Sequence, residues 1–99
     1  MLNITKTVED KKAVVALEGR LDTVTSPELE GELRDVMEGL TDLTLDFEGL
    51  EYISSAGLRV LLAAQKLMNG QGEMKFTNVN EAIMDIFEVT GFSEILTIE

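Results

Sequence analysis

The chain opens with apolar and polar residues in alternation. Residues 2–8 alternate with a period of two, and residues 43–47 do the same, which predicts two strands that are buried on one face. Residues 13–17 form a short apolar run that predicts a more buried strand, and the polar residues 9–12 before it predict a hairpin turn. After that strand, Gly19-Arg20-Leu21-Asp22 is expected to leave the sheet. Two further short strands are expected at residues 74–77 and 95–98.

Three other segments carry apolar residues at the spacing of a helix. The first begins with Ser26 as its N-cap and Pro27 as its first helical residue, since both types are preferred at those positions. A second helix is expected over residues 57–69, apolar on nearly every side and therefore packed against much of the fold. Asn80 can cap a third helix, which Gly91 ends. The buried face of the first helix is expected to contain Leu29, Leu33, Val36, Met37 and Leu40.

This succession gives the element order β-β-α-β-α-β-α-β. Strands that alternate with helices favour a mostly parallel sheet, to which the first hairpin adds an antiparallel pair. We therefore predict a single small α/β domain over residues 1–99, with a mostly parallel mixed sheet packed by helices. The predicted elements use up the chain and leave little length for elaborate active-site loops.

The composition excludes several kinds of active site. The chain contains no cysteine and no histidine. Without cysteine there is neither a disulfide nor a thiolate metal site. Without histidine, the commonest general base near neutral pH and a common zinc ligand are missing, which excludes zinc enzymes and Ser-His-Asp hydrolases. We expect a protein that is not an enzyme and that carries no metal and no cofactor.

The charge of the chain is strongly acidic. There are 19 Asp and Glu residues against 8 Lys and Arg residues, a net charge of −11. This charge opposes binding to nucleic acid or to an anionic membrane and favours a basic protein surface, although it also serves solubility alone. No run approaches the ~18 apolar residues that a membrane span needs. Residues 1–5 lack the order of a signal peptide, so we expect a cytoplasmic protein without direct membrane insertion.

Two adjacent serines precede the second predicted helix. Ser54 and Ser55 fall in residues 52–57, which we expect to form a loop that leads into that helix. A helix N-terminus offers free N–H groups and partial positive charge, so it would tolerate a phosphate on either serine. Serine is also simply a favoured N-cap, and the residues alone leave both interpretations open. The new charge of such a phosphate would face outward beside Asp46, Glu48 and Glu51.

The chain as a whole resembles a STAS domain, the fold of bacterial anti-sigma factor antagonists. The resemblance covers essentially all 99 residues and includes the element order, Gly19-Arg20-Leu21-Asp22 and Leu45-Asp46-Phe47. Its most specific part lies in Tyr52-Ile53-Ser54-Ser55-Ala56-Gly57-Leu58, where the family commonly has Asp-Ser-Ser/Thr/Ala-Gly-Leu. Aligned on Gly57 and Leu58, Ser55 takes the position that the family phosphorylates, and Ser54 takes the position of the aspartate.

The resemblance implies a switch in protein binding. In that family the unphosphorylated antagonist binds an anti-sigma factor that is also its ATP-dependent serine kinase, which frees a sigma factor. Phosphorylation ends the binding, and a metal-dependent serine/threonine phosphatase restores it. The implied phosphorylation site is Ser55, with Ser54 as the alternative acceptor because the usual aspartate is missing. The implied partner-binding residues are Asp22, Ser54, Ser55, Ala56, Gly57 and Arg59.

Several residues near this segment have both a structural and a functional interpretation. Asp22 either contacts the partner or stabilises a turn. Arg59 either steadies a phosphate or partner carboxylate, or lies on a solvated face. Gly57 is expected to let the start of the helix approach the sheet closely. Asp46 is expected to hydrogen-bond the backbone of the serine segment.

Other functions fit parts of the sequence. A STAS-like module that is a constitutive interaction subunit of a signalling or membrane-transport complex would use Ser55 only as a helix cap. An acyl carrier protein is also small and acidic with a serine at a helix start, but its domain is all-helical. An enzyme with Ser55 as nucleophile would need Lys66 or Lys75 as its base. The residues available to a magnesium or calcium site, without the spacing of an EF-hand, are Glu28, Asp46, Glu48 and Glu51.

Overall fold

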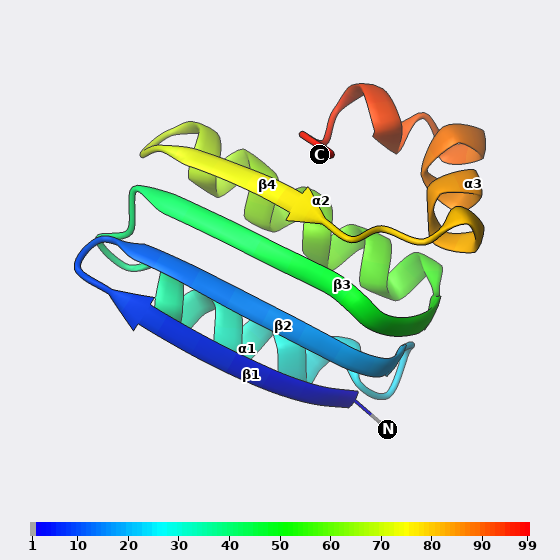
Figure 1. Ribbon diagram of the computed structural model, residues 1–99, viewed down its shortest axis with the longest axis horizontal. Helices are drawn as coiled ribbons and strands as arrows, with labels where there is room; N and C mark the ends of the chain where they lie inside the picture. The colour runs from blue at the N-terminus through cyan, green and yellow to red at the C-terminus, as the bar shows by residue number, and fades with distance from the viewer. Residues whose placement is uncertain (1) are drawn as a thin grey trace.

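Four strands form one sheet, in the order in which they occur along the chain. They are β1 (Leu2–Glu9), β2 (Lys12–Leu21), β3 (Asp42–Ile53) and β4 (Glu73–Thr77). In this computed structural model, which describes residues 2–99, β1 pairs antiparallel with β2, while β2 with β3 and β3 with β4 pair parallel. The predicted hairpin and the mostly parallel mixed sheet are confirmed (Figure 1).

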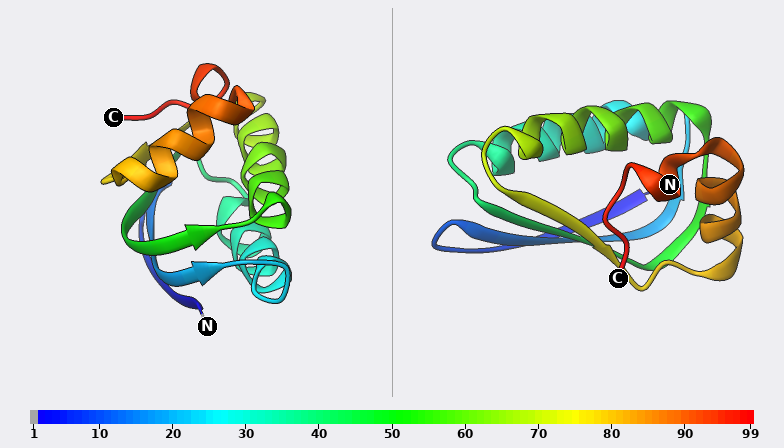
Figure 2. Two further views of the ribbon diagram at one scale, coloured as in Figure 1. Left: turned by 90° about the vertical axis from the view of Figure 1, so that its right-hand side faces the viewer. Right: turned by 90° about the horizontal axis from the view of Figure 1, so that it is seen from above.

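The two longer helices cover one face of the sheet. The helices are α1 (Ser26–Met37), α2 (Ser55–Asn69) and α3 (Glu81–Thr90), and a short 3-10 helix η1 (Phe92–Glu94) follows. Figure 2 shows α1 and α2 side by side on the same face, with α3 packed at one end of the sheet. Within residues 2–99, no helix is long and apolar enough to cross a membrane. The helices and the inward-facing residues of the strands enclose one hydrophobic core.

Three phenylalanines hold α3 to the sheet. Phe47 of β3, Phe76 of β4 and Phe87 of α3 are fully buried, and their ring centroids lie 5.4 to 6.3 Å apart. Aromatic rings at such spacings and tilts attract one another beyond the area that they bury. The cluster therefore fixes α3 beside the ends of β3 and β4.

Strands β2 and β3 extend further than the sequence pattern predicts. Residues 19–21 remain in β2 rather than leaving the sheet, and β3 continues through Tyr52 to Ile53, so the loop predicted at residues 52–57 was wrong. Two register shifts between β2 and β3 place extra residues in β3 after Asp46 and after Leu50. Such bulges break the alternation of apolar and polar positions that marks a strand.

Asp46 stabilises the first of these bulges. Its Oδ1 atom accepts a hydrogen bond from the backbone N–H of Glu48 at 3.0 Å and another from the Asn78 amide at 3.0 Å. The predicted hydrogen bond from Asp46 to the serine segment was therefore wrong. Its carboxylate instead ties the bulge in β3 to the chain that follows β4.

The strand predicted at residues 95–98 is also absent from the described part of the chain. The turn of η1 extends to Ile95, which has helical dihedral angles (φ −95°, ψ −40°). Beyond it, Phe76 donates to the Thr97 carbonyl and accepts from the Glu99 N–H, both at 2.9 Å, and Ile98 forms a single bridge to Phe76. The turn thus takes the first residue of the predicted strand, and the residues after it form only this single bridge to β4.

The ends of α3 follow the predicted local chemistry, whereas the start of α1 does not. Asn80 caps α3 through Oδ1, which accepts from the Ile83 N–H at 2.9 Å, and Gly91 ends it with φ 82°, as predicted. The predicted N-cap of α1, Ser26, was wrong by one residue, because Thr25 takes that position without a side-chain cap bond. The Ser26 hydroxyl donates instead to the carbonyl of Asp22.

Candidate functional site

The two central strands end side by side, and each leads directly into a helix. Leu21 at the end of β2 pairs with Ile53 at the end of β3, and the Ser54 N–H donates to the Leu21 carbonyl at 2.9 Å. A short turn joins Leu21 to α1, and Ser54 alone joins Ile53 to α2. The N-termini of both helices therefore lie at the edge of the sheet that is formed by the carboxyl ends of β2 and β3, on the right in Figure 1. Parallel α/β folds commonly bind their ligands at the carboxyl ends of their strands.

Ser54 is the N-cap of α2. Its backbone is extended (φ −99°, ψ 174°), its Oγ atom accepts from the Gly57 N–H at 3.4 Å, and its carbonyl accepts from the Leu58 N–H at 3.0 Å. The side chain is partly buried. The first of these bonds satisfies one of the backbone N–H groups that a helix start otherwise leaves free, so the hydroxyl oxygen of Ser54 already serves as a cap.

Ser55 differs from its neighbour. It is the first residue of α2, its side chain is exposed, and its hydroxyl makes no hydrogen bond within residues 2–99. Ala56 beside it is half-buried, and Gly57 is buried beneath the helix start. Of the two serines, Ser55, which the resemblance implied as the phosphorylation site, is the one with the exposed side chain, whereas the alternative acceptor Ser54 is partly buried.

The turn before α1 is built around the carboxylate of Asp22. Its Oδ1 atom accepts from the N–H groups of Val24 and Thr25, both at 3.0 Å, and from the Thr25 hydroxyl at 3.2 Å. The hydrogen bond from the Thr25 backbone is the largest of the effects that hold the pKa of Asp22 below its ordinary value. The turn-stabilising role of Asp22 is thus observed, next to Ser54, and its contact with a partner stays a prediction.

A groove runs between α1 and α2 and begins at Ala56, the residue that follows Ser55. The part near the N-termini of the two helices has a volume of about 410 Å³, and a smaller apolar part of about 150 Å³ continues it along the helices. Both parts are lined by Glu30, Val60 and Ala63. The N-terminal part is further lined by Thr23, Ser26, Pro27, Ala56 and Arg59. The second part is further lined by Leu33, Arg34, Met37, Ala64 and Leu67. We call the two parts together the α1–α2 groove.

Two arginines flank the serines in this acidic chain. Arg59 is exposed on α2, four residues after Ser55, and lines the α1–α2 groove. Arg20 near the end of β2 is paired across the sheet with Tyr52, and its guanidinium carbon lies 4.2 Å from the centroid of the Tyr52 ring. The Arg20–Tyr52 pair was not foreseen, because it depends on the register that the bulges set.

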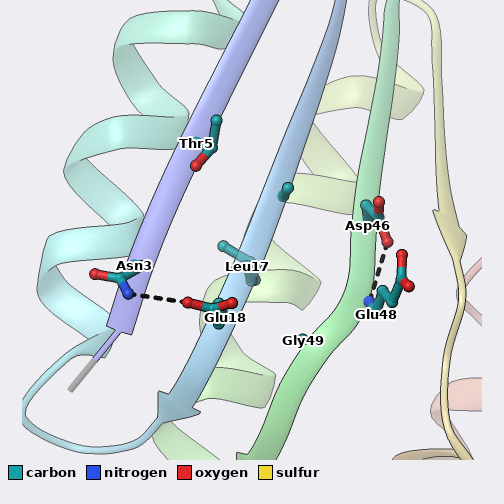
Figure 3. Close-up of a pocket in the computed structure, with 8 residues that line it drawn as sticks. Asn3, Thr5, Leu17, Glu18, Asp46, Glu48 and Gly49 are labelled. Atoms are coloured by element: carbon teal, nitrogen blue, oxygen red, sulfur yellow. Dashed lines mark hydrogen bonds between the residues drawn. The ribbon is translucent and has the colours of Figure 1, made fainter.

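The acidic residues Asp46 and Glu48 lie elsewhere. They line a hollow of about 430 Å³ on the open face of the sheet, where Asn3 donates to Glu18 at 3.2 Å (Figure 3). Asp46 precedes Ser54 by eight residues of strand, a separation on the order of 20 Å. The prediction that a phosphate on the serine segment would face Asp46 and Glu48 was therefore wrong, while its proximity to Glu51, four residues before Ser55, stays a prediction.

The acidic residues considered for a divalent cation do not form a site. Asp46 and Glu48 line the open-face hollow, while Glu28 lies in the first turn of α1. Among residues 2–99, no group of three or more acidic, histidine or cysteine side chains is placed to hold a metal ion.

The residues predicted to bind a partner are thus gathered at one edge of the sheet. Ser54 and the turn at Asp22 are joined through Leu21, and α2 presents the rest from its first two turns. Ser54 and Gly57 shape the edge, whereas Ser55 and Arg59 are exposed on it. The arrangement offers an exposed serine hydroxyl, an exposed guanidinium and a groove.

Comparison with known proteins finds relatives across the whole chain. A family model described as "Mlab, STAS domain" matches residues 4–97. BtrV of Bordetella bronchiseptica, named as an anti-sigma factor antagonist, is 36% identical over 91 residues, which cover 90% of this chain and 78% of that protein. The anti-sigma-B factor antagonist of Staphylococcus aureus is 33% identical over 97 residues, covering 96% of this chain and 90% of that protein.

Solved structures share the fold at lower identity. The anti-sigma factor antagonist SpoIIAA in its unphosphorylated form matches with a TM-score of 0.76, and the Bacillus protein SpoIIAA in its phosphorylated form matches with 0.75. Both are 17% identical and cover 100% of this chain, and 87% and 91% of their own chains, respectively. At this identity the likeness is one of fold.

Proposed function

The chain belongs to the STAS-domain family, and on that premise we propose that it is an anti-sigma factor antagonist switched by phosphorylation of Ser55. Unphosphorylated, it binds an anti-sigma factor through the edge that carries Ser55 and the α1–α2 groove. Phosphorylated, it releases that partner. The relatives named as antagonists, at 33% and 36% identity over nearly the whole chain, support the role.

The observation that carries the proposal is the difference between the two serines. Ser54 caps α2, and Ser55 stands exposed and free of hydrogen bonds among the described residues. Aspartate, the usual family residue at the position of Ser54, is as good an N-cap as serine. The exchange at Ser54 therefore leaves the helix start, and with it the presentation of Ser55, in place.

The chemistry of the switch belongs to the partners. We propose that the anti-sigma factor is also the kinase and that it supplies ATP and magnesium. The Ser55 oxygen attacks the γ-phosphorus of ATP, an O–P bond forms as the bond to ADP breaks, and the serine proton passes to a base of the kinase. A metal-dependent serine/threonine phosphatase later hydrolyses the ester and releases inorganic phosphate.

The phosphate disrupts binding without unfolding the domain. Ser55 is exposed, so a phosphate there displaces no core residue. It adds a charge of about −1.5 to −2 beside the α1–α2 groove. A partner seated over the groove would have to strip water from this charge, and burying an unpaired charge is costly.

The same proposal covers location and catalysis. A kinase that uses ATP and a sigma factor both act in the cytoplasm, so we place this protein there. The role requires no catalysis by this chain's own residues, since Ser55 is the substrate of the kinase, and we propose that the protein is not an enzyme. Its net charge of −11 favours a protein partner over nucleic acid.

Mass spectrometry of the protein from its native cells tests the proposal. We expect a fraction heavier by one phosphate, with the phosphate mapped to Ser55. Ser55→Ala should bind the anti-sigma factor permanently, whereas the matched Ser54→Ala variant should still be phosphorylated and released. A chain that stays unmodified through growth and stress, with unchanged partner binding in Ser55→Ala, would refute the switch and indicate a constitutive interaction subunit.

A further inference from the structure

Arg59 and Ser55 lie one above the other on α2. Residues four apart on a helix are neighbours on its surface, about 5–6 Å apart between Cβ atoms. Helical side chains also lean toward the N-terminus, so a side chain at position 59 extends over the turn that contains Ser55. The neighbours of Arg59 in the α1–α2 groove agree, because Ala56, Thr23 and Pro27 all belong to that end of the groove.

The guanidinium of Arg59 has no anionic partner of its own. The ion pairs among residues 2–99 are Lys6 with Glu32, Arg34 with Glu30, and Lys75 with Glu99. Within the same residues Arg59 donates no side-chain hydrogen bond, and its side chain is exposed. In a chain with 19 carboxylates, this arginine is left available at the one place where a phosphate is proposed to be added.

We propose that Arg59 binds the phosphate of phosphorylated Ser55 and that its guanidinium is thereby withdrawn from the α1–α2 groove. The inference rests on the proposed phosphorylation of Ser55. In the unphosphorylated protein, Arg59 offers a partner a positive group in the groove. In the phosphorylated protein, the same group is paired within its own helix. Phosphorylation then removes a partner contact as well as adding a charge.

The chemistry of the pair suits this role. A guanidinium binds phosphate oxygens through parallel hydrogen bonds. The order, with the anion four residues N-terminal to the cation, is the favourable one on a helix. Carboxylates on the adjoining elements oppose the phosphate: Asp22 on the turn before α1, Glu28 and Glu30 on α1, and Glu51 near the end of β3. The carboxylate of Glu30 already has a cationic partner, since its Oε1 atom lies 3.7 Å from Nη2 of Arg34. The other nearby arginine, Arg20, lies over the Tyr52 ring.

The test uses protein into which phosphoserine is inserted at position 55 during synthesis, so it does not depend on a kinase. The second pKa of the phosphate, ordinarily about 6, is measured by ³¹P NMR titration. We expect Arg59→Gln to raise this pKa by about 0.3 to 0.7 units, and Arg59→Lys to raise it less. Lys66→Gln is the control, because it removes the same charge from an exposed site about 10 Å further along α2. It should shift the second pKa of the phosphate by less than about 0.1 units.

A second measurement needs no substitution. In the unaltered phosphoprotein, the Nε–H resonance of Arg59 should titrate together with the ³¹P signal. Equal pKa shifts in Arg59→Gln and Lys66→Gln, or an Arg59 resonance that ignores the titration, would overturn the pairing. The phosphorylation switch and the Arg59–phosphate pair can be refuted independently. An absence of phosphate on Ser55 in cells contradicts the switch, whereas the pKa of the inserted phosphoserine tests the pair whether or not cells phosphorylate Ser55.

Discussion

Gly57 of α2 approaches Leu21 of β2 so closely that a Cβ atom on residue 57 would stand 2.7 Å from the Leu21 Cγ atom. The same atom would stand 3.0 Å from Cγ1 of Ile53. The start of α2 is thus held against the ends of both central strands, as the sequence predicted for this glycine. This contact fixes the position of Ser55, two residues earlier on α2, relative to the ends of β2 and β3.

Gly57→Ala should therefore destabilise the domain although alanine favours helices. Overpacking costs about 1–3 kcal/mol and outweighs the propensity gain of about 1 kcal/mol. The control is Gly31→Ala in α1, where an added Cβ meets nothing within 4 Å, so the gain of up to about 1 kcal/mol should appear alone. Urea denaturation measures both, and equal effects of the two substitutions would refute the close approach.

Ser54 should tolerate aspartate better than alanine. Ser54→Ala removes the acceptor for the Gly57 N–H and should lower the free energy of unfolding by about 0.5–1 kcal/mol, the lower part of the usual range because the bond is 3.4 Å long. Ser54→Asp restores a cap and adds favourable charge at the helix start. Ser55→Ala, measured by the same urea titration, should be nearly neutral. A larger loss in Ser55→Ala than in Ser54→Ala would contradict these roles.

Asn80 should be costly to replace because both ends of its amide are used. Its Oδ1 caps α3 at Ile83, and its Nδ2 donates to the Leu50 carbonyl at 2.9 Å. Asn80→Ala loses both bonds and should cost about 2 kcal/mol in urea denaturation. Asn80→Ser keeps a capping oxygen and should cost about half as much. Equal losses in the two variants would show that the cap contributes nothing.

The stability of the domain should depend on pH through Asp22. Hydrogen bonds from Thr25 and Val24 lower the pKa of this carboxyl from its ordinary 3.8. A carboxyl with a depressed pKa stabilises the fold fully above its unfolded value and loses that contribution as the pH falls through its folded value. The advantage of wild type over Asp22→Asn should thus be largest at neutral pH and vanish below the folded pKa. Thermal unfolding against pH, with a ¹³C titration of Asp22, checks this, and a pKa at or above 3.8 would refute it.

The parts of the fold that depend on local chemistry could be predicted from the sequence. Asn80 and Gly91 bound α3 by the hydrogen bond and the backbone angle that their residue types favour. The end of β3 depends instead on two bulges, the first of which Asp46 stabilises, and these erase the alternation by which a strand is recognised. The pattern therefore placed the strand's end at Phe47.

The candidate site could be located from the sequence, and the resemblance assigned the acceptor role to Ser55, but the residues alone did not show which serine caps α2. Ser54 and Ser55 are the same residue type, and either can cap a helix. The distinction comes from the Leu21 carbonyl, which binds the Ser54 N–H and thereby fixes the residue at which α2 begins. That bond joins segments more than thirty residues apart, so no local pattern contains it.

The two bulges in β3 are places where the length of this strand can change. Deleting one residue between Glu48 and Glu51 would remove an extra residue and leave regular pairing with β2, so Leu50 and Ile53 would stay on the core face. A deletion between Asp42 and Asp46, where the pairing is regular, would instead turn residues of the strand to the opposite face. Deletions among relatives should therefore collect at the bulges and at the exposed hairpin turn of Asp10 and Lys11, while the regular part of β3 keeps its length.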